Sequence, residues 1–513
     1  MRVTASRSGA WLAGTLVALL LFRFWFAASL PMTGDEAYFV LWGERPAGGY
    51  YDHPPMVGWW LAALLPFGRA EWWLRLPAVL LPFVLAWGAW WLLQPHGNER
   101  ARFAALLTLL QPVDVWNVLI TTDTPVVLFS FLSVLAYVQG LRRRSVVWHV
   151  AAGLLLGMAF LGKYFAALLG FAYAAHVLLG RRDGARWLQF SALTVAALLG
   201  PAYNLWWNSE HCWVNVLFNF YNRHDKAGFE WQNPLLYFAS LAYLATPWVL
   251  WRLWRDRRAW HKAAYGDVAL RALPWLAGVP LLLFFAMAFG KSVGLHWLLA
   301  FMPLLAVLAA VVSPPAALQR LLHWSAGFAL LHALLAVVLL AMPVTTWQKT
   351  TFYPGLVLTM RGAEMEKALR EPLAHCGEGC ELAMESYSSA ATLAYATARP
   401  VIVFGEGSFH ARQDDLDTDL RALDGRDLLL LAKTAPDLAA YAPYFRALSV
   451  SSFEVAGATF HLVHGQGFNY AVYHDRVLTR VRERFYRLDK LPAFLPQRGC
   501  IFIERYFSET VTK

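Results

Sequence analysis

Long apolar runs recur along this sequence, and most are long enough to cross a membrane. A hydrocarbon core of about 30 Å needs about twenty apolar residues in helical form. The chain is therefore expected to be mostly α, a polytopic bundle of about eleven transmembrane helices. The expected spans lie near residues 10–30, 73–93, 102–120, 125–141, 146–161, 164–179, 187–207, 235–251, 272–290, 297–313 and 321–342.

Composition supports a membrane protein. Hydrophobic residues make up 58% of the chain and charged residues only 15%, whereas about a quarter of a typical soluble domain is charged. The 25 tryptophans fit side chains anchored at lipid–water interfaces. The N-terminus resembles a signal peptide in its basic start and apolar core. That core is long, contains Arg23 and ends in bulky residues, so it is expected to be an uncleaved first transmembrane helix.

The distribution of basic residues predicts the orientation of the bundle. If the N-terminus lies inside, the inner gaps between spans hold seventeen Lys and Arg residues and the outer gaps hold six. Positive charge favours the cytoplasmic side, so loops 31–71 and 208–234 are expected outside. Because the net charge of +10 lies in these short gaps, it does not indicate nucleic-acid binding.

The apolar runs end near residue 344. Residues 1–344 are therefore expected to form the membrane domain, and residues 345–513 a soluble α/β domain outside the membrane. In this region RPVIVFG and RDLLLLAK are typical of strands, and GAEMEKALREPLA is typical of a helix. Cys376 and Cys380 would lie in an oxidising compartment, where they form either a small disulfide loop or a pair of free thiols.

Two acids each lie just past a membrane span on the predicted outer side. Asp35 begins the acid-rich stretch DEAYFVLWGERPAGGYYDHPP, and Asp123 lies in TTDTP. Such acids suit three tasks: binding a divalent cation, acting as a base on an acceptor hydroxyl or amine, or relaying protons. Asp123 has a simpler alternative, because Thr122 or Asp123 can cap the following helix.

Cationic side chains lie on the same predicted side. Lys163 in FLGKY either snorkels at a helix end or binds an anionic substrate head group as a point charge. Lys291 and His296, in KSVGLHW, have the same two interpretations: side chains at a helix end, or cations that bind an anionic head group.

Polar residues also interrupt the apolar runs. Gln111, Asp114 and Asn117 have a three-residue spacing, which predicts one shared helix face. Arg23 lies well inside the first span, where it either pairs with an acid of the bundle or reaches toward a phosphate.

A metal site is only weakly indicated. The loop 208–234 contains Glu210, His211, His224 and Asp225, and imidazole beside carboxylate can ligate a transition metal. No tight ligand spacing is present. The sequence therefore leaves a divalent cation open, with Asp52 and His211 as its candidate ligands.

The segments DEAYF, GYYDHPP, TTDTP, FLGKY and GPAYNLWWNSEHCW, in this order, resemble the PMT-like branch of the GT-C glycosyltransferases. This branch includes protein O-mannosyltransferases and bacterial transferases that add aminoarabinose to lipid A. The resemblance implies an inverting transferase that takes sugar from a polyprenyl-phosphate carrier on the non-cytoplasmic face. It further implies a bacterial inner membrane location with the C-terminal domain in the periplasm.

The resemblance also implies residue roles. Asp35 would be the catalytic base or acceptor-orienting group, with Asp123 as the second catalytic acid. Asp52 would contact metal or acceptor, and Lys163 the carrier phosphate. This chain departs from the relatives that act on lipid A at two places. Those relatives commonly have an Arg soon after the DE pair, where this chain has Ala37–Tyr38, and a Lys before the loop proline, where this chain has His53. The full set of expected substrate contacts is Glu36, Tyr51, Asp52, His53, Lys163, Lys291 and His296.

Other functions remain open from sequence alone. A transporter or flippase for a lipid or small ion could use the same acids as relays, and a non-catalytic protein could bind a partner through its exterior domain. The sequence identifies neither the sugar nor the acceptor. A lipid or envelope-glycan acceptor is favoured by analogy, and a protein acceptor is the other choice.

Overall fold

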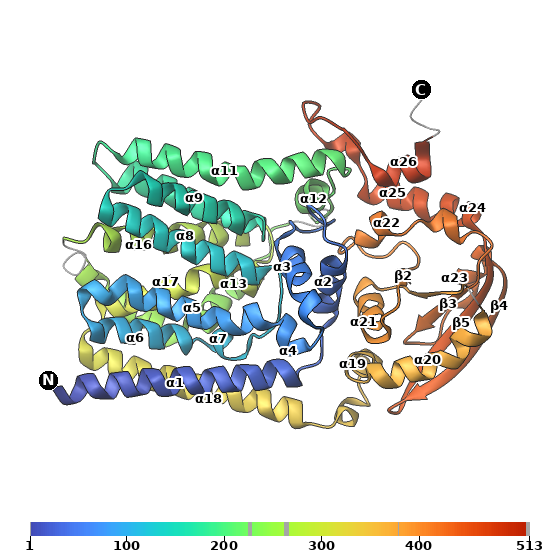
Figure 1. The fold of residues 1–513 in the computed structure, drawn as a ribbon, viewed down its shortest axis with the longest axis horizontal. Coiled ribbons are helices and arrows are strands. Elements are labelled where there is room, and N and C mark those ends of the chain that lie inside the picture. Colours follow the sequence, from blue (N-terminus) through green and yellow to red (C-terminus); the bar gives the residue numbers. More distant parts are fainter. Residues whose placement is uncertain (1, 224–227, 261–265, 378, 509–513) are drawn as a thin grey trace. The chain divides into compact units, whose positions relative to one another are not determined.

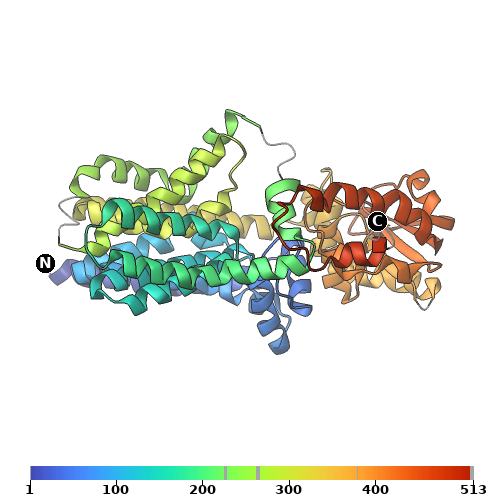
Figure 2. The same ribbon diagram turned by 90° about the horizontal axis from the view of Figure 1, so that it is seen from above.

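The computed structural model describes residues 2–223, 228–260, 266–377 and 379–508. The chain forms two compact units, which we call the helical unit and the α/β unit (Figures 1 and 2). The helical unit comprises Met1–Leu30, Phe67–Asn204 and Ala227–Leu340. The α/β unit comprises Pro31–Pro66, Leu205–Lys226 and Ala341–Lys513. The predicted exterior loops thus group largely with the C-terminal region.

Long helices that run side by side make up the helical unit (Figure 1). Their apolar side chains pack inside the unit or face outward, as expected for helices in a lipid environment. The elements are α1 (Arg2–Ser29), α4 (Glu71–Leu74), α5 (Leu76–Leu93), α6 (Asn98–Leu109), α7 (Pro112–Trp116), α8 (Asp123–Arg143), α9 (Val146–Phe160), α10 (Ala167–Ala175), most of α11 (Arg186–Glu210), α13 (Gln232–Ala245), α14 (Pro247–Arg255), α16 (Val268–Ala288), α17 (Met302–Val312) and α18 (Pro315–Ala341).

Fewer helices are long and apolar enough to cross a membrane than the sequence predicted. Within the described residues six satisfy both criteria, and α13 with α14, bent by 94°, would make a seventh. The count of about eleven is therefore not confirmed. The reason is visible in the chain: α9 has only 15 residues, and prolines begin α7 and α14 where continuous spans were expected. Proline cannot donate the backbone bond that a continuing helix requires.

A five-stranded mixed sheet forms the core of the α/β unit, in the order β2-β1-β3-β5-β4. β1 pairs in parallel with β2 and β3, while β5 is antiparallel to both β3 and β4. The predicted strands in RPVIVFG and RDLLLLAK correspond to β2 and β3. The strand bounds are β1 (Glu381–Met384), β2 (Val401–Val403), β3 (Leu428–Ala432), β4 (Phe445–Val455) and β5 (Ala458–Phe468).

Both faces of this sheet are covered. Successive side chains of a strand point to opposite faces, so the run of leucines in β3 feeds two hydrophobic clusters. Leu429 and Leu431 pack on the side of α19 and α20, and Leu428 and Leu430 pack on the side of α25 and α26. The helices of the unit are α2 (Gly34–Glu44), α3 (Met56–Leu64), α12 (Val214–Val216), α19 (Tyr353–Met360), α20 (Gly362–Cys376), α21 (Tyr387–Thr397), α22 (Gln413–Asp417), α23 (Leu438–Tyr441), α24 (Tyr470–Tyr473), α25 (Thr479–Phe485) and α26 (Ile501–Phe507).

Two disulfides occur in the α/β unit. Cys376 and Cys380 are joined, so the disulfide loop, rather than the pair of free thiols, is confirmed. Cys212 is joined to Cys500 across 288 residues of sequence, a pairing that the sequence did not predict. The second bond ties the short segment around α12 to the C-terminal helices, in agreement with the oxidising location expected for this unit.

Candidate active site

The acid-rich stretch begins at the N-terminus of α2, where two neighbouring acids have different roles. Thr33 and Glu36 form a capping box: the Thr33 hydroxyl accepts from the Glu36 backbone N–H at 3.3 Å, and Glu36 accepts from the Thr33 N–H at 3.1 Å. Glu36 is fully buried. Asp35, by contrast, is exposed and takes no part in the capping box. The geometry therefore gives Glu36 a structural role and leaves Asp35 available to a substrate.

Asp35 is held by a tyrosine from a distant part of the sequence. The Tyr387 hydroxyl, at the first residue of α21, donates to an Asp35 carboxylate oxygen at 3.1 Å. Gly34 makes this approach possible, because a Cβ there would collide with the Ser388 side chain. Burial, and then the negative charge of Asp35, raise the pKa of Tyr387 well above its usual range. The phenol thus stays protonated and remains a donor.

Two further groups complete the surroundings of Asp35. Burial and the nearby Arg223 lower the pKa of His410, against a smaller opposite effect of Asp35. This imidazole is therefore neutral near pH 7. Asp52 is 7% exposed and lies 3.7 Å from the His53 Nε2. Asp52 also interacts electrostatically with Arg223 and Tyr387.

The α/β unit thus brings together the predicted Asp35, Asp52 and His53 with three residues that sequence reasoning missed. Tyr387, His410 and Arg223 lie in stretches without a recognisable motif, and only the fold places them here. A cavity of about 450 Å³ borders Tyr387 and His410, and acidic side chains, including Glu385, Glu406 and Asp414, line its wall.

The loop that carries Asp52 is fixed by asparagines of the segment near α12. Asn215 donates to the carbonyls of Tyr50 and Tyr51, the latter at 2.9 Å, and Asn222 donates to the Tyr51 hydroxyl at 3.1 Å. The Tyr50 ring stacks on Trp42 at 4.1 Å. Tyr51 is fully buried. Its expected contact with substrate therefore has no support from its position, which favours a packing role.

In the helical unit, Asp123 and Lys163 form an ion pair. The Lys163 ammonium lies 2.9 and 3.1 Å from the two carboxylate oxygens of Asp123. Asp123 is the first residue of α8, and Lys163 precedes the short turn Tyr164–Ala166. Their side chains are only 14% and 9% exposed. The capping alternative is not supported, because neither Thr122 nor Asp123 makes a side-chain capping hydrogen bond at the start of α8. Asp123 instead pairs with a nearly buried lysine, and its catalytic role stays a prediction.

Lys291 and His296 lie close to the Lys163 turn. The Lys291 ammonium is 5.6 Å from the centre of the Trp297 ring, a cation–π distance. His296 contacts the edge of the same ring. Trp297 also packs on Phe165, with ring centres 4.0 Å apart. The helical unit thus places Lys291 against an aromatic cluster that includes Phe165, two residues after Lys163.

Arg23 neither pairs closely with an acid side chain nor extends toward solvent. It is fully buried and donates to the backbone carbonyls of Ala78, Val79, Asp114 and Asn117, at 2.5–3.1 Å.

The predicted shared helix face beside Arg23 is only partly correct. α7 contains Asp114, but Gln111 and Asn117 flank the helix in extended conformation. All three nevertheless line one cavity with Arg23.

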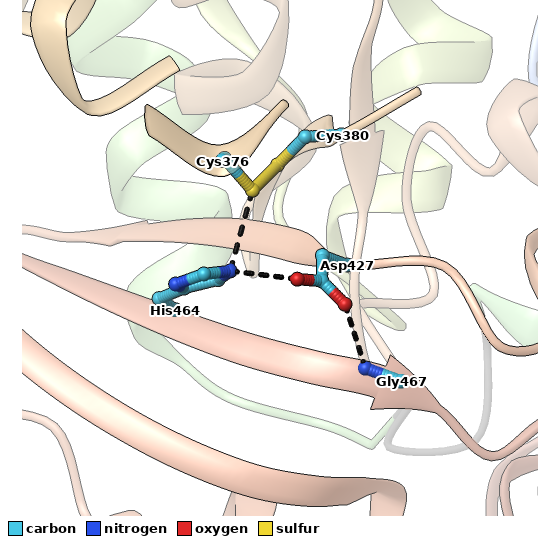
Figure 3. The surroundings of a disulfide bond; sticks show 5 residues. All are labelled: Cys376, Cys380, Asp427, His464 and Gly467. Atoms are coloured by element: carbon cyan, nitrogen blue, oxygen red, sulfur yellow. Dashed lines mark hydrogen bonds and ion pairs between the residues drawn. A yellow bond between two sulfur atoms is a disulfide. The ribbon is translucent and has the colours of Figure 1, made fainter. Parts of the chain in front are cut away.

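The proposed metal ligands are not brought together by the described residues. His211 stacks on Trp207 and its Nδ1 lies 2.8 Å from the Trp207 carbonyl. His224 and Asp225 lie outside the described residues. In the described part of the chain, three potential ligands lie close enough together to hold a metal ion: Cys376, Asp427 and His464 (Figure 3). Because Cys376 is in a disulfide, it offers no thiolate to a metal.

Known proteins resemble this chain in sequence and in fold. Residues 52–207 match the family described as dolichyl-phosphate-mannose-protein mannosyltransferase. The segment contains Asp52, Asp123 and Lys163. The family match covers less than half of the chain; with the relative given next it indicates a glycosyltransferase similar to the PMT-like branch, and the solved structures given next share the fold.

The curated relative is the lipid A galacturonosyltransferase RgtD of Rhizobium johnstonii, 27% identical over 351 residues, which cover 65% of this chain and 69% of the relative. Two crystal structures of ArnT from Cupriavidus metallidurans, one apo and one bound to undecaprenyl phosphate, share the fold with a TM-score of 0.63 and 16% identity. They cover 89% and 88% of this chain and 98% of the ArnT chain.

Proposed function

We propose that this protein transfers a sugar from a polyprenyl-phosphate carrier to a lipid or envelope-glycan acceptor, with inversion at the sugar. Transfer would occur on the periplasmic face of a bacterial inner membrane, where we also place the α/β unit. Two relatives support the substrate classes: one acts on lipid A, and the other was crystallised with undecaprenyl phosphate. A protein acceptor is the alternative within the same chemistry.

The observation that carries this proposal is the exposed Asp35 carboxylate, which accepts a hydrogen bond from the hydroxyl of the half-buried Tyr387. In the proposed reaction an acceptor hydroxyl or amine attacks the anomeric carbon from the side opposite the phosphate. The new bond forms as the carbon–oxygen bond to phosphate breaks, and the phosphate leaves with the bonding electrons. Asp35 takes the acceptor proton, as a general base within hydrogen-bond reach can do.

Lys163 and Lys291 are proposed to bind the carrier phosphate. Positive charge placed where the leaving group develops negative charge stabilises the transition state most effectively in a partly buried site. Lys163 is nearly buried, and Asp123 balances its charge. A buried ammonium without such a partner would be costly, so Asp123 keeps the phosphate site charged and folded before the donor arrives.

A transporter or flippase is less well supported. Transporters built from inverted repeats place broken helices at corresponding positions of two halves. In the described residues the bend between α13 and α14 is the one break of this kind that the helices show. The acids also gather at helix ends and in the α/β unit, instead of following a path through the bundle.

The test uses the purified full-length protein with a radiolabelled polyprenyl-phosphate sugar and lipid A as acceptor. Asp35→Asn should lower kcat by about 10²–10⁴-fold, the range for loss of a general base. Glu44→Gln is the matched control, because it removes an exposed carboxylate from the other end of α2, and it should keep kcat within about twofold.

Mass spectrometry of the product would identify the acceptor. Full activity of Asp35→Asn would overturn the role of Asp35. Movement of the carrier lipid across liposomes without sugar transfer would favour the transporter.

A further inference from the structure

A second cavity lies at the opposite end of α8 from Asp123. It has a volume of about 480 Å³ and is bounded by the end of α8, the π-helical turn His176–Gly180, the loop before α11 and the first turn of α16. Helix α8 has 21 residues and therefore extends about 30 Å at 1.5 Å per residue. The cavity is thus separate from the Asp123–Lys163 site.

Four arginines line this cavity, and one acid accompanies them: Arg144, Arg181, Arg182, Arg271 and Asp183. Three of the arginines are exposed at its rim, whereas Arg181 is buried. The lining therefore carries an excess of three positive charges. So many like charges around one hollow repel one another, and an anion in the cavity would relieve that repulsion.

Arg181 is held ready to bind an anion. Its Nε and Nη2 donate to the two Asp183 oxygens at 2.8 and 2.7 Å, and Nη2 also donates to Gln189 at 2.7 Å. The hydrogen bonds and charge of Arg181 lower the pKa of Asp183, so this acid is ionised and orients the guanidinium. The Nη1 of Arg181 is buried and makes no hydrogen bond of good geometry within the described residues, although Tyr137 lies close to this guanidinium. An unpartnered buried donor is costly.

Exposed apolar side chains flank the basic rim. Leu178 and Leu179 precede the Arg181–Arg182 pair and are 53% and 65% exposed, and Leu188 follows it at 64%. α8 and α16 both qualify as membrane spans, so their ends lie near a membrane surface. A phosphate at the rim would therefore place an attached acyl chain against these leucines. Basic pockets between membrane helices on the cytoplasmic side commonly bind acidic lipid head groups in this way.

We propose that this cavity binds a phosphate group at the predicted cytoplasmic surface, and that the phosphate belongs to an anionic phospholipid. Arginine suits this ligand because its planar fork of donors matches phosphate oxygens. The proposal does not depend on sugar transfer, because the cavity lies at the opposite end of α8 from Asp123 and its partner Lys163.

The test measures lipid binding by native mass spectrometry of the full-length protein in detergent, with phosphatidylglycerol as the probe. Because Arg181 also fixes its own loop, the decisive variant is the double exchange Arg182→Gln and Arg271→Gln, at two exposed rim positions. It should weaken binding of the first phosphatidylglycerol at least tenfold. Arg320→Gln is the control: it removes an exposed arginine on the same predicted side but outside the cavity, and it should change binding less than twofold.

A parallel titration with inorganic phosphate distinguishes the two sources of the phosphate group. If inorganic phosphate binds as tightly as phosphatidylglycerol, and the double variant loses this binding, the cavity is a phosphate site. The proposal that the phosphate belongs to a phospholipid is then overturned. If the double variant binds phosphatidylglycerol and phosphate as the Arg320→Gln control does, the site itself is overturned. A retained thermal midpoint in the double variant would show that lost binding is not lost folding.

Discussion

The ion pair between Asp123 and Lys163 should make the loss of one partner more harmful than the loss of both. Lys163→Met leaves the Asp123 carboxylate in a site where its side chain is only 14% exposed. Asp123→Asn likewise strands the ammonium, which is 9% exposed. The double variant has no buried charge at this position, and its two side chains retain roughly the original volume.

The expected magnitude follows from the geometry. Charges about 3 Å apart attract by roughly 5 kcal/mol at the effective dielectric constant of about 20 that suits protein sites. Removing one partner of a buried pair typically costs about 3–5 kcal/mol, whereas replacing both with neutral groups is often close to neutral. Lys163→Met should therefore lower the free energy of unfolding by about 3 kcal/mol or more. The double variant should recover most of that loss, so the coupling energy should approach the sum of the two single losses, about 5 kcal/mol or more.

The assay is an unfolding titration of four proteins with sodium dodecyl sulfate in mixed micelles, combined with sugar-transfer rates. The double variant should be more stable than Lys163→Met, yet as inactive, because the phosphate has lost its ammonium. Simple additivity of the two single losses, within about 0.5 kcal/mol, would refute the buried ion pair. Recovery of transfer activity in the double variant would refute the phosphate-binding role of Lys163.

Two further predictions concern the α/β unit. Replacing Cys212 and Cys500 with serine should lower the thermal midpoint much more than replacing Cys376 and Cys380. By the chain-entropy relation, a cross-link over 288 residues is worth about 4 kcal/mol more than one over four. Equal shifts in a thermal melt would contradict this. Burial raises the pKa of Asp414 to about 7, so the folded state holds a proton there that the unfolded state has already released above about pH 4. Stability should therefore fall as pH rises from about 4 to 7, by at most about 1.4 kcal/mol per pH unit, and Asp414→Asn should flatten that part of the pH profile of the thermal midpoint.

The sequence predicted those parts of the structure that depend on local pattern. The helix of GAEMEKALREPLA and the strands of RPVIVFG and RDLLLLAK follow from short-range periodicity, and each is present. The capping box in TGDE is a local signal that the sequence interpretation missed: Thr33 and Glu36 have the spacing that defines the motif, yet Glu36 was expected to contact substrate. In the structure Glu36 belongs to the helix cap and is buried, whereas Asp35 is exposed.

The parts that were missed depend on contacts between distant segments. Tyr387 lies 352 residues from Asp35, and nothing in its local sequence distinguishes it from other tyrosines. The bond between Cys212 and Cys500 spans 288 residues, so spacing could not suggest it. Helix lengths were overestimated for a different reason: apolar composition continues across prolines, such as Pro112, at which the helix itself is interrupted.

Arg23 illustrates how such an interruption is stabilised inside an apolar bundle. Between the end of α7 at Trp116 and the start of α8 at Asp123 the backbone is not helical, so its carbonyls lack the partners that a helix would supply. At membrane depth each unsatisfied polar group costs several kcal/mol. The Arg23 guanidinium donates to carbonyls of α7 and Asn117, and also to the first turn of α5. The buried Arg23 guanidinium thus fixes the segment that leads into Asp123. The sequence suggested that Arg23 pairs with an acid or reaches toward a phosphate, whereas in the structure its hydrogen bonds go to backbone carbonyls.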